Sequence, residues 1–280
     1  MTDKYKNIVD NLIRWGMSSD KLFAALVIGS QARDNHAADE YSDMDIVLIV
    51  DSPSYFIESD KWLNEIGVFH VSFVENTMDG LKERRVLFSD VLDVDFIFRP
   101  INTIEKISTD EVSLILSYGY SILIDKIGLQ EKLTRRDTTK QALNLPTEQD
   151  FINIVNDFWY HSIWTMKKLK RGELWTAKFC VDSYMKWKLL SIIEYNAHTT
   201  HGYEYNTWHS GRFLEEWAES WIVEKLALCF SRYDEESIKA ALQSTMDLFR
   251  VVAVEVAEKL NFQYPKAADE YTTAWVTSSL

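Results

Sequence analysis

Two aspartates beside an apolar run have the residue type and spacing of a divalent-metal site. Asp43 and Asp45 flank Met44, and because side chains alternate along a strand, both carboxylates would point to one face. Two carboxylates on one face repel each other, and a divalent cation removes that repulsion. Mg²⁺ prefers one or two carboxylates, completed by water and substrate phosphates. The simpler alternative is a solvated strand end that carries two ordinary acids.

A second acidic pair lies inside a segment whose other face is apolar. Asp93 and Asp95 alternate with Val94 and Phe96 in the run 91–98. Carboxylates in the middle of such a strand are unfavourable on a packed face, unless that face forms a functional site. The alternative is an edge strand that is protected by inward-pointing charge.

A turn of small residues completes the set. Gly29 and Ser30 end the apolar run 22–30, and Asp43 follows 13 residues after Ser30. Such a turn leaves backbone N–H groups free to bind an anion, although most strand-final Gly-Ser pairs are simply turns. If Asp43, Asp45 and Asp95 share one face, three carboxylates would lie beside this phosphate-binding turn. Such an arrangement is suited to nucleotidyl transfer that is assisted by two metal ions.

Strands and helices in the first half of the chain must position these residues. Short apolar runs alternate there with amphipathic segments, which predicts a mixed α/β domain. Strands are expected at 22–30, 44–50, 68–73, 91–98 and 121–125, and helices at 3–16, 54–65, 77–87 and 102–117.

The second half shows helical periodicity and no strand signal. Thr147, with an acid three residues later, predicts a helix start. Helices are expected from there to about residue 170, at 173–197, at 211–229 and from Asp234 onward. We therefore expect an α+β protein with two domains: a catalytic mixed sheet with flanking helices at 1–143, and an all-α bundle at 144–280.

The chain resembles a known family in both halves. The run 26–50, followed by 92–100, is similar to the nucleotidyltransferase superfamily, and specifically to the aminoglycoside 6-adenylyltransferases that modify streptomycin. The segments 171–195 and 205–217 resemble the helical domain of that family. The resemblance implies transfer of AMP from ATP to a hydroxyl of an aminoglycoside, with Mg²⁺ as cofactor and pyrophosphate as the second product.

The resemblance also implies roles for single residues. Gly29 and Ser30 would bind the phosphates, Asp43 and Asp45 would bind metal, and Asp95 would be a metal ligand or the general base, with Asp93 ranked second; Arg33 and Lys178 are further nucleotide-binding candidates. One departure from many relatives is that Gln31 follows the Gly-Ser pair, and Arg33 comes two residues later.

A cationic acceptor needs acids and aromatic faces. The helical half offers Trp159, Glu173, Asp182 and Trp208 as candidate acceptor-binding residues. Lys178, Asp182 and Lys186 share one helix face, and the alternative for them is an exposed, salt-bridged stripe.

Composition limits the partners. A net charge of −13 argues against nucleic acid and fits a cationic small molecule or no charged partner at all. The two cysteines form no disulfide framework, the start does not resemble a signal peptide, and no long apolar stretch exists. We therefore expect a cytoplasmic protein that does not cross a membrane. Nothing in the residue pattern indicates an oligomeric state.

Three other functions stay open. One is nucleotidylation of another hydroxylated small molecule, such as a lincosamide, or of a protein. Another is glycosyl transfer, which also uses Asp-x-Asp but is disfavoured by the Gly-Ser turn and Asp95. The third is a non-catalytic nucleotide-binding module, which would be expected to have lost one of the acids.

Overall fold

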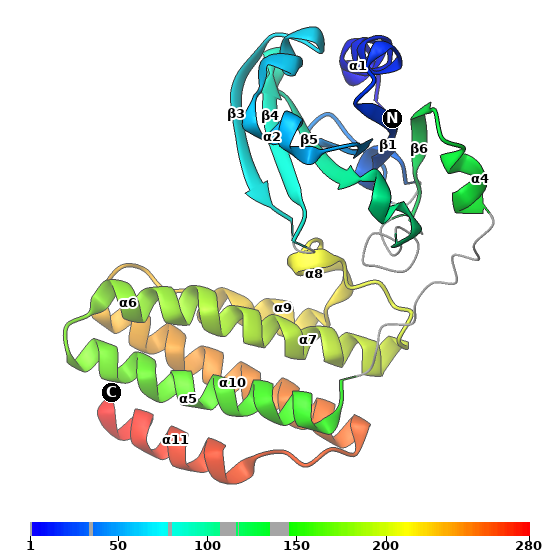
Figure 1. Ribbon diagram of the computed structural model, residues 1–280. Helices are drawn as coiled ribbons and strands as arrows, with labels where there is room; N and C mark the ends of the chain where they lie inside the picture. Colours follow the sequence, from blue (N-terminus) through cyan, green and yellow to red (C-terminus); the bar gives the residue numbers. More distant parts are fainter. Residues whose placement is uncertain (1, 34–35, 78–79, 107–115, 117, 135–145) are drawn as a thin grey trace. The chain divides into compact units, whose positions relative to one another are not determined.

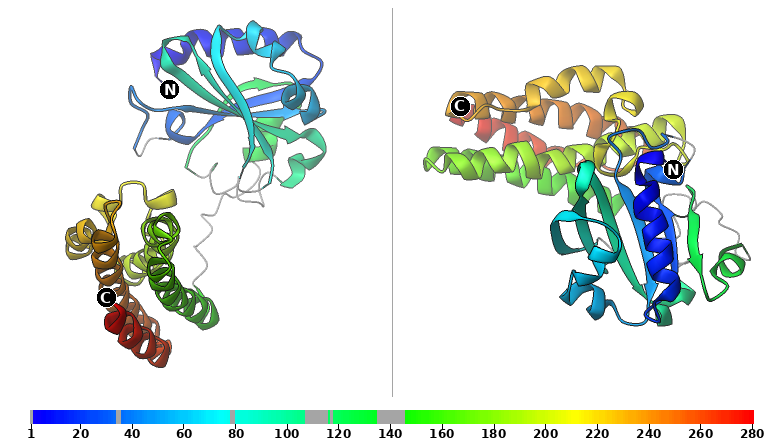
Figure 2. Two further views of the ribbon diagram at one scale, coloured as in Figure 1. Left: turned by 90° about the vertical axis from the view of Figure 1, so that its left-hand side faces the viewer. Right: turned by 90° about the horizontal axis from the view of Figure 1, so that it is seen from above.

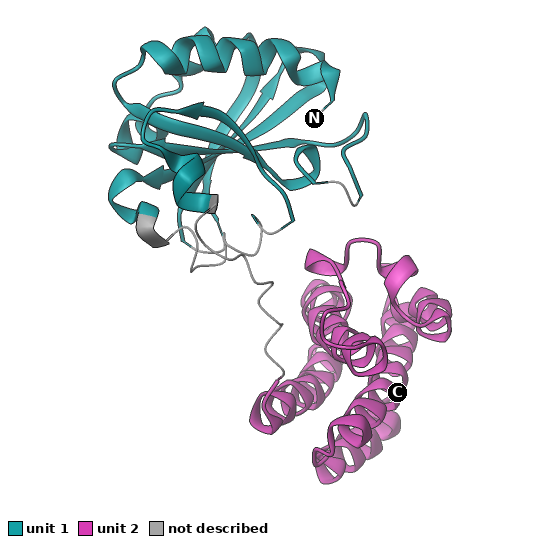
Figure 3. Cartoon of the chain, turned by 90° about the vertical axis from the view of Figure 1, so that its right-hand side faces the viewer, with its two compact units in different colours: residues 1–141 teal, residues 142–280 magenta. Residues whose placement is uncertain are grey.

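The computed structural model describes residues 2–33, 36–77, 80–106, 116, 118–134 and 146–280. The chain forms two compact units, Met1–Gln141 and Ala142–Leu280 (Figure 3). A mixed sheet with flanking helices makes up the first unit, and the second is helical (Figure 1). The α+β class predicted from the sequence is confirmed. The expected boundary between residues 143 and 144 falls outside the described residues.

The described part of the first unit contains one six-stranded sheet. Its strands are β1 (Leu22–Ile28), β2 (Met44–Val50), β3 (Phe69–Asn76), β4 (Lys82–Phe88), β5 (Leu92–Pro100) and β6 (Ser121–Asp125). Their order across the sheet is β3-β4-β5-β2-β1-β6. The β2–β5 pair is parallel, and every other neighbouring pair is antiparallel.

Apolar side chains cover both faces of the central strands. On one face, α1 (Lys6–Ser18), α2 (Pro53–Glu58) and the 3₁₀ turn Lys61–Glu65 contribute buried residues that pack with those of the sheet. Figure 2 shows α1 running along this face. The opposite face carries a smaller cluster, to which α4 (Leu129–Thr134) and the 3₁₀ turn Ile101–Lys106 contribute. Burial on both faces explains why β1 and β2 are almost continuous apolar runs.

One predicted helix of this unit is wrong. Residues 77–87 were expected to be helical, but β4 covers 82–88 and pairs with β3 in an antiparallel hairpin. Val86 and Phe88 are buried in the core, while Glu83 and Arg85 lie on the other side of the strand. Four consecutive charged residues, 82–85, hid the period of two residues in this strand. Most of the helix expected at 102–117 falls outside the described residues.

The second unit is built from α5 (Glu148–Lys170), α6 (Leu174–Phe179), a π-helical turn (Cys180–Tyr184), α7 (Met185–His201), α8 (Leu214–Trp217), α9 (Ser220–Leu226), α10 (Glu235–Leu260) and α11 (Lys266–Ser279). Thr147 and Asp150 form the capping box at the start of α5, and Asp234 caps α10. The single helices expected at 173–197 and 211–229 are interrupted, and α11 was not expected. Among the described residues, no helix combines the length and apolar character needed to cross a bilayer.

The core of the helical unit contains a stacked pair of aromatic rings. Phe158 of α5 and Phe249 of α10 are both completely buried, with ring centroids 3.6 Å apart and planes 3° from parallel. Trp159 packs edge-on against both rings. This cluster joins the two longest helices of the unit.

Replacing one ring of this pair is expected to destabilise the helical unit. Phe249→Ala leaves a cavity, and such truncations cost about 3–5 kcal/mol. Urea unfolding followed by tryptophan fluorescence measures the loss. Val251→Ala, on the same helix but 51% exposed, is the matched control and should change stability by no more than about 0.5 kcal/mol. Equal losses in the two variants would contradict this account of the core.

Candidate functional site

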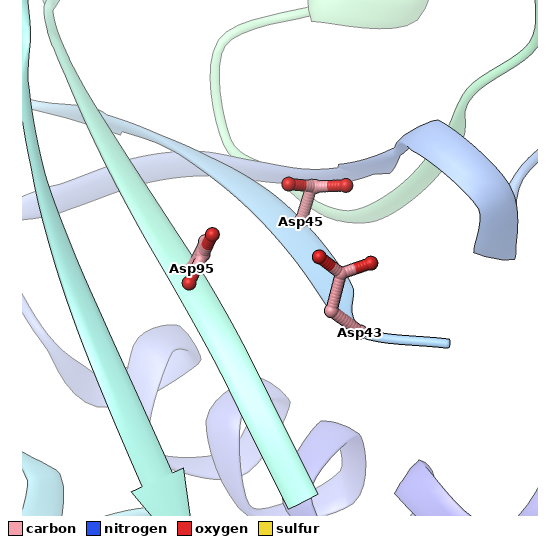
Figure 4. A group of neighbouring side chains, drawn as sticks. All are labelled: Asp43, Asp45 and Asp95. Carbon is pink, nitrogen blue, oxygen red and sulfur yellow. The ribbon is translucent and has the colours of Figure 1, made fainter. Parts of the chain in front are cut away.

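Three aspartates converge at one end of β2 and β5. Asp43 immediately precedes β2, Asp45 is its second residue, and Asp95 is the partner of Asp45 in the parallel ladder. Each residue offers a carboxylate oxygen, and these three atoms lie within 4.8 Å of one another. Figure 4 shows the three side chains rising from these two neighbouring strands.

Strand alternation places the acids on the sheet face opposite α1. Met44 and Ile46 on β2, and Val94 and Phe96 on β5, are buried in the core beneath α1. The intervening Asp45 and Asp95 must therefore point to the other face. That face is covered by the smaller apolar cluster further along β2 and β5, so the acids lie at the edge of that cluster. Asp95 is buried there and is only 8% exposed.

The Gly-Ser turn lies directly beside Asp45. Ile28, the last residue of β1, pairs with Asp45, and Gly29 has a φ of +69°. A Cβ atom at Gly29 would lie 2.3 Å from Asp45 Oδ2, so glycine is required both for the backbone conformation and for the close approach. Ser30 Oγ is buried and has no hydrogen-bond partner within the described part of the chain.

The residues after the Gly-Ser pair differ in orientation. Gln31 is only 3% exposed, and its amide group donates to the backbone oxygen of Asp43 at 3.1 Å. Arg33 is half-buried, and its Nε donates to the backbone oxygen of His36 at 3.0 Å. Its predicted contact with a nucleotide stays a prediction. Asp93, ranked second to Asp95, has its backbone oxygen 3.0 Å from the Tyr5 hydroxyl.

Arg85 and two glutamates were not predicted as site residues. Arg85 pairs with Asp95 in the β4–β5 ladder. Its Nε lies 3.4 Å from Asp95 Oδ2, 3.1 Å from Glu83 Oε1 and 2.6 Å from Glu75 Oε1. The guanidinium therefore offsets part of the negative charge around Asp95. Assigning 77–87 as a helix hid Glu83 and Arg85, and the four consecutive charges at 82–85 give no alternation that would have revealed the strand. Glu75 lies in β3, just beyond the strand expected at 68–73.

Burial raises the pKa of Asp95 to about 7. The positive charge of Arg85 lowers this pKa, while the negative charges of Glu83, Asp43 and Asp93 raise it further. Ionising Asp95 is therefore unfavourable in the protein alone, and a divalent cation bound by the three aspartates would remove that cost. Three hard oxygen ligands suit Mg²⁺ better than a sulfur-preferring metal.

The predicted helical-unit residues Lys178 and Asp182 contact each other on α6 and the π-helical turn. Lys178 Nζ donates to Asp182 and to the backbone oxygen of Ser231, the latter at 2.6 Å. Asp182 also accepts from the Ser231 hydroxyl at 2.8 Å. This network ties the turn to the segment before α10. Lys178 and Asp182 form the salt bridge of the alternative, but both are partly buried, and Lys186 donates to the Val181 backbone oxygen and the Thr245 hydroxyl instead. Nucleotide binding by Lys178 and acceptor binding by Asp182 stay predictions.

The other three acceptor candidates lie in different surroundings. Trp159 is 1% exposed, which leaves no surface for a ligand and speaks against its predicted contact with the acceptor. Glu173 is paired with Lys168 and Arg171 at the end of α5. Trp208 is half-buried and packs edge-on against the Phe213 ring. Roles for Glu173 and Trp208 in acceptor binding stay predictions.

A methyl group at Gly29 is expected to disrupt the carboxylate group. Gly29→Ala should weaken Mn²⁺ binding, measured by electron paramagnetic resonance, by about tenfold or more because it displaces Asp45. Gly128→Ala is the matched control, since Gly128 has a φ of +70° but nothing within 4 Å of its added Cβ. It carries the same backbone strain and should bind Mn²⁺ like the wild type. Equal weakening in both variants would show that strain alone is responsible.

Removing the charge of Asp95 is expected to stabilise the metal-free protein at high pH. Since the folded-state pKa of about 7 exceeds the unfolded value, stability falls as pH rises from about 4 to 7. In a chelator, Asp95→Asn should therefore raise the melting temperature by several degrees at pH 8 and less at pH 4.

Asp125 provides a comparison with the opposite sign. Although burial tends to raise its pKa, hydrogen bonds from the backbone of Leu129, Gln130 and Ile127 lower it overall. Its stabilising contribution is present above the unfolded pKa and is lost as pH falls. Asp125→Asn should therefore lower the melting temperature at pH 8. A lower melting temperature for Asp95→Asn under the same conditions would contradict the buried, proton-retaining state of that carboxyl.

Known proteins resemble this chain along nearly its whole length. The aminoglycoside 6-adenylyltransferase of Campylobacter jejuni is 22% identical over 266 residues, covering 93% of this chain and 90% of the relative. That of Bacillus subtilis (strain 168) is 22% identical over 268 residues, covering 93% and 92%. The crystal structure of an aminoglycoside 6-adenyltransferase from Bacillus subtilis aligns with 20% identity and a TM-score of 0.48, covering 98% of this chain and 96% of that chain.

A family model decides the assignment. The model described as Streptomycin adenylyltransferase matches residues 2–279. This match covers both units, including the Gly-Ser turn and the three aspartates. The chain therefore belongs to the streptomycin adenylyltransferase family of nucleotidyltransferase enzymes.

Proposed function

We propose that this enzyme transfers AMP from Mg·ATP to a hydroxyl group of a streptomycin-like aminoglycoside and releases pyrophosphate. The observation that carries the proposal is the group of Asp43, Asp45 and Asp95, with oxygens within 4.8 Å, in a chain that matches the family over residues 2–279. The named relatives supply the substrate class, and the carboxylate group supplies the chemistry.

The turn at Gly29 and Ser30 supports binding of the triphosphate. Ser30 Oγ is buried and lacks a partner among the described residues, and an unsatisfied buried hydroxyl is costly. A phosphate oxygen would satisfy it. Because glycine at position 29 has no side chain, the backbone can approach the phosphates closely.

The three aspartates support a divalent cation next to that turn. When bound there, Mg²⁺ neutralises charge on the phosphates and lowers the pKa of the attacking hydroxyl. Asp43, directly before β2, and Asp45, its second residue, would bind the ion side by side. Asp95 comes from the neighbouring strand and would bind it from a second direction or accept a proton.

The reaction needs a proton acceptor close to the acceptor hydroxyl. The oxygen of that hydroxyl forms a bond to the α-phosphorus, while the bond from this phosphorus to the bridging oxygen breaks. The electron pair leaves with pyrophosphate, and the hydroxyl proton passes to Asp95.

Charge favours a cationic acceptor. The chain carries a net charge of −13, and the carboxylates of Asp43, Asp45 and Asp95 lie within 4.8 Å of one another. Such a field raises the local concentration of a polycation. An aminoglycoside has ammonium or guanidinium groups beside its hydroxyls, so the same molecule supplies the charge and the nucleophile.

Product formation with defined acceptors tests the proposal. The purified protein is incubated with ATP, Mg²⁺ and streptomycin, and pyrophosphate release is followed together with the mass of the drug. We expect pyrophosphate and a drug that is heavier by one AMP residue. Pyrophosphate release with another hydroxylated drug but not with streptomycin would contradict the proposed acceptor, while the proposed AMP transfer would stand. No release with any acceptor would contradict the reaction itself.

Replacing one metal-binding carboxylate is expected to abolish turnover. Asp45→Asn removes a contact to the cation worth several kcal/mol, which corresponds to a loss of about 10²-fold or more in rate. Asp10→Asn is the matched control, because the contact that Asp10 makes within the described residues is an exposed i,i+4 pair with Lys6 on α1. Its rate and melting temperature should be those of the wild type. Retained activity in Asp45→Asn would remove this residue from the metal site.

A further inference from the structure

The first residues of the chain lie against the segment that carries Asp43. Gln31 Oε1 accepts from the Thr2 backbone nitrogen at 2.9 Å and from the Thr2 hydroxyl at 3.2 Å. The other end of the same buried amide donates to the backbone oxygen of Asp43 at 3.1 Å. One side chain therefore connects the N-terminal segment, the Gly-Ser turn and a metal-binding residue.

Tyr5 makes a second connection to this segment. Its ring is completely buried in the core beneath α1. Its hydroxyl lies 3.0 Å from the backbone oxygens of both Ser42 and Asp93, and 3.3 Å from Asp93 Oδ1. Ser42 directly precedes Asp43, and Asp93 lies two residues before Asp95. The hydroxyl therefore lies between the two chain segments that supply the carboxylates.

Lys4 adds a third connection further upstream. Its Nζ donates to the backbone oxygen of Glu40 at 2.7 Å. We call Thr2, Lys4, Tyr5 and Gln31 the N-terminal clasp, because together they connect the start of the chain to residues 40, 42 and 43.

The ladders of the sheet explain why Asp43 needs this support. Asp45 has register partners in both β1 and β5, and Asp95 has partners in β2 and β4. The registers of β2 begin only at Met44 with β5 and at Asp45 with β1, so Asp43 lies outside them. Among the described contacts, the backbone oxygens of Ser42 and Asp43 are bound by the side chains of Tyr5 and Gln31.

We propose that Tyr5 and Gln31 are positioning residues of the nucleotidyl-transfer site, which fix Asp43 against Asp45 and Asp95 for cation binding. The inference rests on the proposed function for the identity of the reaction. Like groups that orient metal ligands from behind, neither side chain has to touch the cation or the substrate. Without them, repulsion between the carboxylates would move Asp43 away, because its backbone is not fixed by the sheet.

Tyr5→Phe tests the proposal with the smallest change. The ring stays in the core, and only the hydroxyl is lost. We expect Mn²⁺ affinity, measured by electron paramagnetic resonance, to weaken by about tenfold. In steady-state assays, the cation concentration for half-maximal rate should rise by a similar factor, while the rate at saturating cation stays within about twofold of the wild type.

Gln31→Glu tests the other connection. The carboxylate can still accept from Thr2, but it cannot donate to the backbone oxygen of Asp43, and two oxygens then face each other. This variant should weaken Mn²⁺ binding at least as much as Tyr5→Phe.

Tyr264→Phe is the matched control for the loss of a buried hydroxyl. The Tyr264 hydroxyl donates to Asp269 Oδ2 at 2.8 Å within the helical unit. Its removal should lower the melting temperature, as loss of a hydrogen bond to a charged group does, without changing Mn²⁺ affinity. If the clasp had only a structural role, Tyr5→Phe would likewise lower the melting temperature and leave Mn²⁺ affinity unchanged.

The outcomes separate the two proposals. Wild-type Mn²⁺ affinity in both Tyr5→Phe and Gln31→Glu would overturn the positioning role and leave the proposed function intact. Weakened binding in these variants with unchanged binding in Tyr264→Phe would support it. If the wild-type protein itself bound no Mn²⁺, the metal site would fail, and the positioning role would fail with it.

Discussion

Repulsion between three aspartates is the constraint on which the first unit depends. Their oxygens lie within 4.8 Å of one another, and one carboxyl is buried well enough for its pKa to reach about 7. No fold gathers such groups for stability, since isolated charges in an apolar setting are costly. The arrangement is understandable as a site that becomes favourable when a cation and a phosphate are present.

Different parts of the structure limit that cost in different ways. Pairing of β2 with β5 fixes Asp45 opposite Asp95, and the guanidinium of Arg85 supplies one positive charge from β4. Gly29 lets the phosphate-binding turn approach Asp45 without a steric conflict. Asp43 lies beyond the ladders, and side chains from the first residues of the chain reach its backbone. The stability of the sheet and the geometry of the site are therefore coupled.

Local sequence patterns predicted the aspartates of the site, but not the side chains that contact and position them. An apolar run bounded by Asp43 and Asp51 identified β2, and alternation identified the acidic face of β5. Four consecutive charged residues at 82–85 obscured the strand pattern of β4. Arg85 was therefore missed. Tyr5 and Gln31 could not be identified, because their partners are 12 to 88 residues away and only folding brings them together. Trp159 shows the converse, since residue type alone does not distinguish an aromatic ligand contact from a core residue.

The heat of ATP binding, with and without a divalent cation, tests the central claim most directly. If the three aspartates bind the cation that in turn holds the phosphates, calorimetry should show ATP binding in Mg²⁺. Affinity should fall by at least about tenfold, a loss of 1.4 kcal/mol, when EDTA removes the cation. Equal ATP affinity in Mg²⁺ and in EDTA would contradict the account.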